Sequence, residues 1–84
     1  MPVLARFYGI VIRMYFLASE HNPPHIHAIY GEDAAALDIR TGEVMDGYLP
    51  QRAIALVREW MELHREELLV MWETQEFKKI DSLE

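Results

Sequence analysis

The first half of the chain alternates apolar and polar positions with the period of two that is typical of β-strands. In Phe7–Leu17 every second side chain is apolar, and Arg13 and Tyr15 lie between these positions. Three more strands are predicted after it, separated by segments that contain Gly or Pro: His25–Tyr30, Ala34–Arg40 and Glu43–Met45.

The second half of the chain changes to helical spacing. Pro50 suits the first turn of a helix, and apolar residues then recur three and four positions apart: Ala53, Leu56, Val57, Trp60, Leu63 and His64, then Leu68, Leu69 and Trp72. One helix from Pro50 to Phe77 would be about 42 Å long at 1.5 Å per residue, longer than so small a domain is wide. We therefore predict a bend near Leu63–Arg65 that divides the segment into two helices.

These patterns predict one α+β domain over residues 1–84. We expect a small antiparallel sheet of three to four strands, followed by two C-terminal helices packed on one face. An apolar content of 51% is high enough for a folded domain of this length. Trp60 is expected to pack against Ile12 or Leu37, because these apolar faces have no other partner.

The negative charge is concentrated in the helical half. Residues 1–42 carry three basic against four acidic groups, and residues 43–84 carry five against ten, for a total of −6. Such a balance weighs against nonspecific binding of nucleic acid, which needs a basic surface. Protonation of the clustered histidines would make the first half positive, so RNA stays among the candidate partners.

Cysteine usage and hydropathy bear on the compartment. The chain contains no cysteine, which fits a reducing cytosol, and we expect a cytoplasmic protein. Arg6 and Arg13 interrupt the apolar N-terminal segment, whose longest uncharged run, Phe7–Ile12, is far shorter than the ~20 residues of a membrane span. Neither a membrane-spanning helix nor a signal peptide is expected.

Three of the four histidines lie within seven residues, His21–His27, at the start of a predicted strand. Successive side chains of a strand point to opposite faces, so His25 and His27 share one face. If Ile26 and Leu37 face the helices, polar side chains gather on the open face: His25, His27, Asp38 and Arg40, joined by Arg13 and Tyr15.

This cluster fits three interpretations. As a metal site, His21, His25 and His27 would bind zinc, with Asp38 as a fourth ligand. As a catalytic site, His25 and His27 with Arg13 and Asp38 would suit metal-independent RNA cleavage, in which an imidazole moves a proton and a cation stabilises negative charge. The simplest alternative is an exposed polar face beside a rigid Pro-Pro segment. No cofactor other than zinc is expected.

Several segments, in order, closely resemble a small bacterial family catalogued as domain of unknown function 4160. The resemblance covers nearly the whole chain, and its most specific part is the HNPPHxH block of His21–His27. The other matching segments are Phe7–Ile10, Thr41–Val44, Leu49-Pro50, Val57–Trp60 and His64–Leu68.

The resemblance implies a partner more than an activity. It supplies no catalytic residues, but members of the family resemble components of toxin–antitoxin-like pairs, which implies binding to a second small protein. A more distant likeness is to HicA-type mRNA interferases, which use a histidine on a three-stranded sheet, although this chain is acidic and lacks their N-terminal helix. We therefore predict a component of a two-protein module whose acidic helical half binds the partner. A histidine-dependent ribonuclease and a metal-binding domain are the alternatives, and a homo-oligomer is compatible with each.

Overall fold

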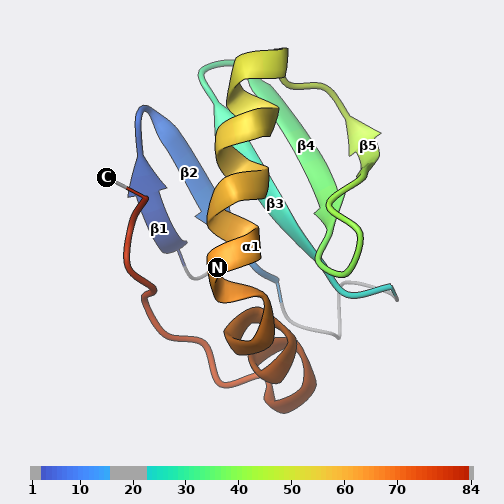
Figure 1. The fold of residues 1–84 in the computed structure, drawn as a ribbon, viewed down its shortest axis with the longest axis vertical. Coiled ribbons are helices and arrows are strands. Elements are labelled where there is room, and N and C mark those ends of the chain that lie inside the picture. The colour runs from blue at the N-terminus through green and yellow to red at the C-terminus, as the bar shows by residue number, and fades with distance from the viewer. Residues whose placement is uncertain (1–2, 16–22, 84) are drawn as a thin grey trace.

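Five antiparallel strands form one sheet in the order β1-β2-β3-β4-β5, and a single helix lies across one face of it (Figure 1). The computed structural model describes residues 3–15 and 23–83. The elements are β1 (Val3–Phe7), β2 (Ile10–Arg13), β3 (His25–Tyr30), β4 (Asp33–Asp38), β5 (Val44–Gly47) and α1 (Gln51–Thr74). The α+β class and the antiparallel sheet are thus as predicted.

The prediction of three to four strands is wrong, because the predicted strand Phe7–Leu17 contains a turn: β1 ends at Phe7 and β2 begins at Ile10. Tyr8 and Gly9 both have positive φ, 51° and 80°, as in a two-residue turn that matches the twist of paired strands. Phe7 and Ile10 pair across this turn, so both face the core. A non-glycine residue in this left-handed conformation costs about 1–2 kcal/mol, and Tyr8 is such a residue.

The prediction of two helices is also wrong, although the bend lies where it was expected. The helix is continuous from Gln51 to Thr74, and His64 has non-helical dihedral angles inside it (φ −125°, ψ 19°). Nδ1 of His64 donates to Oε1 of Glu67 at 2.9 Å, and Nε of Arg65 donates to the carbonyl of Ile39 at 3.0 Å. The two helical stretches therefore meet at a kink at His64, and these side-chain bonds flank it.

The core lies between α1 and the sheet face toward it. Trp60 is fully buried in the same cluster as Ile12 and Leu37. Its ring centroid lies 5.8 Å from that of Phe7, and Nε1 donates to the carbonyl of Asp81 at 2.8 Å. The predicted burial of Trp60 is confirmed, and its ring contacts those of Phe7 and His64.

One member of the predicted apolar stripe does not face the core. Leu63 is 67% exposed, whereas Met61 is fully buried. The buried positions before the kink, Ala53, Val57, Trp60 and Met61, have the spacing of one helical face. Leu63 lies outside that face and contacts solvent.

The chain after α1 returns along the outer edge of β1 (Figure 1). The amide of Ile80 donates to the carbonyl of Leu4, and Oγ of Ser82 donates to that of Arg6, both at 2.8 Å. This segment covers an edge strand that would otherwise expose unpaired backbone groups. In the described ranges, no helix combines the length and the apolarity needed to cross a membrane.

Candidate functional site

Two of the three clustered histidines lie together at the start of β3, as predicted. The ring centroids of His25 and His27 are 5.1 Å apart, and Tyr15 approaches His27 edge-on at 4.4 Å. Arg13 is the residue opposite His27 in the pairing of β2 with β3. We call these four residues, together with Trp72, the histidine end of the sheet.

The prediction that both imidazoles lie on an open face is wrong for His25. Its side chain is only 6% exposed, and its ring centroid lies 5.0 Å from that of Trp72, in the part of α1 that follows the kink. Nδ1 of His25 donates to the carbonyl of Pro23 at 2.7 Å. The kinked helix thus covers the start of β3, and His25 contributes to packing there.

His27 is the accessible member of the pair. It is half-buried, and so is Arg13 on the neighbouring strand. Both lie on the sheet face opposite the buried residues Ile12 and Ala28, which face the helix. An imidazole and a guanidinium therefore lie side by side on this face.

Asp38 pairs with His25 across β3 and β4, as the predicted site requires, but its carboxylate is used by a turn. Oδ1 accepts the backbone N–H groups of Arg40 at 2.7 Å and of Thr41 at 3.2 Å. A short polar side chain that binds the backbone two and three residues ahead stabilises a turn. The structure therefore gives Asp38 a structural role, and Arg40 is exposed beside it.

The predicted metal site is only partly within the structure. His21 lies outside the described residues, so the triad of His21, His25 and His27 is not described. Within residues 3–15 and 23–83, no three His, Asp or Glu side chains are grouped so that they could hold a metal ion.

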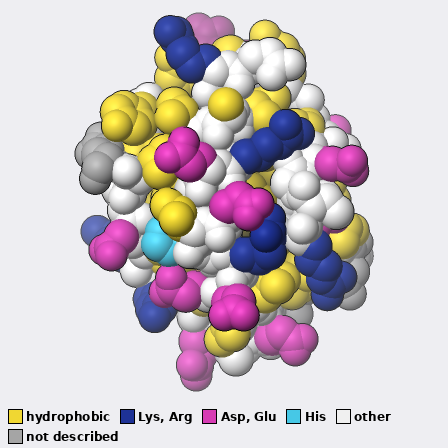
Figure 2. All heavy atoms as spheres, in the orientation of Figure 1, with side chains coloured by type: hydrophobic (Ala, Val, Ile, Leu, Met, Phe, Trp, Pro, Cys, Tyr) yellow, Lys and Arg dark blue, Asp and Glu magenta, His cyan; other side chains and the backbone are white. Residues whose placement is uncertain are grey.

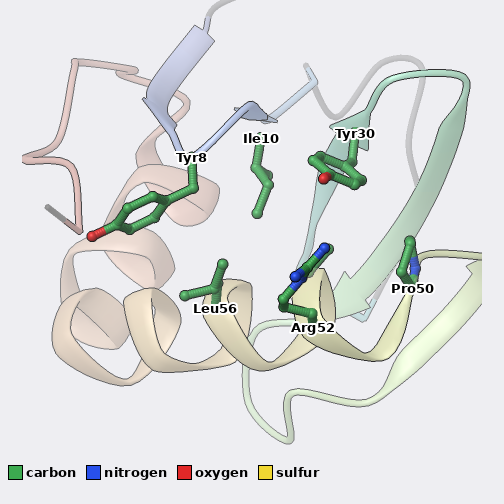
Figure 3. A pocket seen from close by; sticks show the side chains of 7 residues that line it. Tyr8, Ile10, Tyr30, Pro50, Arg52 and Leu56 are labelled. Carbon is green, nitrogen blue, oxygen red and sulfur yellow. The ribbon is translucent and has the colours of Figure 1, made fainter.

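A cavity at the other end of the sheet was not predicted from the sequence. It has a volume of about 390 Å³ and lies between the β1–β2 turn, the end of β3 and the start of α1 (Figure 3). Its lining residues are Tyr8, Ile10, Tyr30, Pro50, Arg52, Ala53 and Leu56, which we call the tyrosine end. The cavity was missed because Phe7–Leu17 was predicted to be one strand. A turn predicted at Tyr8-Gly9 would have indicated it.

Acidic side chains are spread over the face of the molecule on which α1 lies, together with basic ones (Figure 2), and two large apolar residues of α1 are exposed. Leu63 is 67% and Val70 58% exposed. We define the acidic helix face by its exposed residues: Glu59, Glu62, Leu63, Glu66, Val70 and Glu73.

The arginines of α1 do not neutralise this face fully. Nε of Arg58 donates to the carbonyl of Gly42 at 2.7 Å, and Nε of Arg65 binds that of Ile39. Both side chains hold the loop between β4 and β5 against the helix. Only Arg65 also contacts a member of the acidic helix face, Glu62, at 3.3 Å.

The comparisons with known proteins identify a family. No curated protein and no solved structure matches the chain. The family model described as domain of unknown function (DUF4160) matches residues 9–73, which include the whole of β2, β3, β4 and β5 and nearly all of α1. This match covers more than half of the chain, and the protein therefore belongs to the DUF4160 family.

Proposed function

We propose that this protein is a component of a two-protein, toxin–antitoxin-like bacterial module and acts by binding a second small protein through the acidic helix face. The observation that carries the proposal is the exposure of Leu63 and Val70 among glutamates. Full burial of one such side chain contributes about 1.5–3 kcal/mol, and both residues gain only part of this in the isolated protein.

The charge of this face defines the partner's chemistry. Glutamates surround the two apolar side chains, and the chain as a whole carries a net charge of −6. A partner with apolar pockets rimmed by Lys or Arg would complement this face. Opposite charge at the rim accelerates association and excludes other acidic proteins.

The histidine end supports binding better than catalysis. A general acid or base must reach the proton that it transfers. His25 is buried against Trp72, and the Oδ1 atom of Asp38 binds the backbone of a turn. Two of the four residues predicted to form a catalytic group therefore have structural roles.

The product of the neighbouring gene is the first partner to test. Both proteins would be co-expressed, and their affinity measured by titration calorimetry. Leu63→Ser together with Val70→Ser should weaken binding at least tenfold, since about 1.4 kcal/mol corresponds to a factor of ten.

Two other exposed apolar residues provide a matched control. Tyr48 is 64% and Met45 43% exposed, and both lie in or directly after β5 and not on α1. Tyr48→Ser with Met45→Ser should leave the affinity unchanged. Equal loss in both double variants, or no loss in the first, would contradict binding through this face.

A second candidate function rests on His27 and Arg13, which are half-buried neighbours on the face that α1 leaves uncovered. There His27 would transfer a proton during RNA cleavage while Arg13 stabilises the phosphorane. His27→Ala should reduce cleavage of a single-stranded RNA by about 10²–10⁴-fold in the presence of EDTA. Cleavage that requires zinc would favour the metal-binding alternative instead.

A further inference from the structure

We propose that the cavity at the tyrosine end binds a small organic anion with a flat, apolar body. This site lies at the opposite end of β3 from the histidines and is not used by the proposed function. Its volume of about 390 Å³ is within the range of small-molecule sites, about 300–1,000 Å³. Its seven lining residues come from three segments that are close together only in space, Tyr8–Ile10, Tyr30 and Pro50–Leu56.

The polar groups of the cavity favour an anion. The guanidinium of Arg52 makes no hydrogen bond or ion pair with the described part of the chain, although the sequence contains 14 acidic residues. In Figure 3 this guanidinium and the hydroxyl of Tyr30 point toward the same space. A carboxylate or phosphate there would accept charge-assisted hydrogen bonds from Arg52 and a further bond from Tyr30.

The backbone beside Arg52 also favours the binding of an anion. The first turn of α1 contains no acidic residue, and no side chain caps its N-terminus at Pro50. The amide groups of the first turn therefore present a partial positive charge next to the guanidinium. An anion held by Arg52 would gain from both.

The remaining wall is apolar and suits a flat group. In Figure 3 Ile10 lies between the two tyrosines, and Leu56 lies below them on α1. Tyr8 stands at the rim with 56% of its surface exposed, and an aromatic ring at that place can cover one face of a planar ligand.

The conformation of Tyr8 supports a role in ligand binding rather than in stabilising the fold. Its φ of 51° places it where Asn, Asp or Gly are favoured, and its exposed ring gains little from burial in return. Backbone strain of this kind is concentrated at binding sites. Contact with a ligand would account for a tyrosine at this position.

Indole-3-acetate and its neutral analogue indole-3-acetamide are suitable probes, because they share a flat body and differ in charge. Each would be titrated into the ¹⁵N-labelled full chain, with amide resonances as the readout. We expect indole-3-acetate to shift resonances at Tyr8, Tyr30 and Arg52, with an affinity about tenfold or more above that of the amide. Equal affinities, or shifts confined to other parts of the chain, would overturn the proposal.

Three variants assign the anion contact. Arg52→Gln should lower the affinity for indole-3-acetate about tenfold and leave that for the amide unchanged. Tyr30→Phe, which keeps the ring, should lower it about threefold. Arg40→Gln removes an exposed charge elsewhere and should have no effect. If Arg52→Gln binds the acetate like the unmodified chain, or Arg40→Gln weakens it equally, Arg52 does not bind the anion and the proposal fails.

Discussion

The polar side chains at the two ends of strand β3 differ: those at one end are packed, and those at the other border a cavity. At the histidine end, Trp72 covers His25, whose Nδ1 binds a backbone carbonyl. At the tyrosine end, the side chains of Arg52 and Tyr30 border an open cavity and form no hydrogen bond or ion pair with the described residues. The end with the more reactive residue types is thus the better packed.

This difference shows that a reactive type of side chain is not necessarily one that a ligand or substrate can reach. Imidazoles near a carboxylate and a guanidinium predict a functional site in a sequence because they suit proton transfer and metal binding. Whether they act depends on whether a substrate reaches them, and packing decides this. A guanidinium and a phenol beside a cavity are less distinctive as a sequence pattern, yet they are open to a ligand.

The largest expected effect tests whether both ends depend on one core. Trp60 is fully buried between them, beside Phe7 and hydrogen-bonded to the carbonyl of Asp81. Trp60→Ala should lower the free energy of unfolding by about 3–5 kcal/mol. Denaturant titration followed by circular dichroism measures the loss, and Trp60→Phe should cost less. A loss below about 1 kcal/mol would mean that the ends are stabilised separately.

The next prediction concerns the two histidines themselves. His25→Ala removes a buried, hydrogen-bonded ring and should cost about 1–3 kcal/mol of unfolding free energy. His27→Ala removes a half-buried ring and should cost less than about 1 kcal/mol.

Urea titration of both variants under the same conditions measures this contrast. His27→Ala serves as the control for the loss of an imidazole from the same strand. Equal losses in the two variants would show that the histidine end is not divided into a packed and an accessible residue.

At the tyrosine end, the β1–β2 turn should be sensitive to a single methyl group. Gly9 has a φ of +80°, and a Cβ there would lie 3.3 Å from Cε1 of Tyr30. Gly9→Ala should cost about 1–2 kcal/mol from the backbone conformation alone, and more from displacement of the Tyr30 ring.

Gly31 provides the matched control for this effect. Its φ is +64°, but nothing lies within 4 Å of an added Cβ. The difference between Gly9→Ala and Gly31→Ala in thermal unfolding therefore measures the contact with Tyr30. If Gly31→Ala is the more destabilising, the Tyr30 ring does not brace the turn.

Much of the fold follows from local patterns in the sequence. The period of two in Ile10, Ile12 and Met14 predicted which face is buried, and the bend near His64 followed from length alone. The turn at Tyr8 was missed because it changes the sequence pattern very little. Phe7 and Ile10 pair across the turn and face the same side, so the alternation of apolar positions is shifted by only one residue.

The candidate site was less predictable because it depends on distant segments. Parity along β3 correctly placed His25 and His27 on one face, but it gave no information about Trp72, which reaches His25 only through the helix kink. The cavity likewise requires the hairpin turn and the start of α1 to meet. Such contacts are tertiary, and a single sequence does not specify them.

The smallest predicted effect concerns the kink that brings Trp72 to His25. The hydrogen bond from His64, with the nearby charges of His64 and Lys78, holds the pKa of Glu67 below its usual value of 4.5. The unfolded state therefore binds a proton more readily than the folded state, so this contact stabilises the fold above pH 4.5 and its contribution is lost as the pH falls through the lowered pKa. The effect should be small and weakened by salt, because Glu67 is exposed.

Comparing urea midpoints from about pH 3 to 6 in the unmodified chain and Glu67→Gln measures this effect, since the variant should lose this part of the pH dependence. Glu73→Gln, an exposed position on the same helix, is the control. The indole N–H resonance of Trp72 should also respond to this titration before that of Trp60, and simultaneous changes at both would show that the kink does not control the histidine end separately from the core.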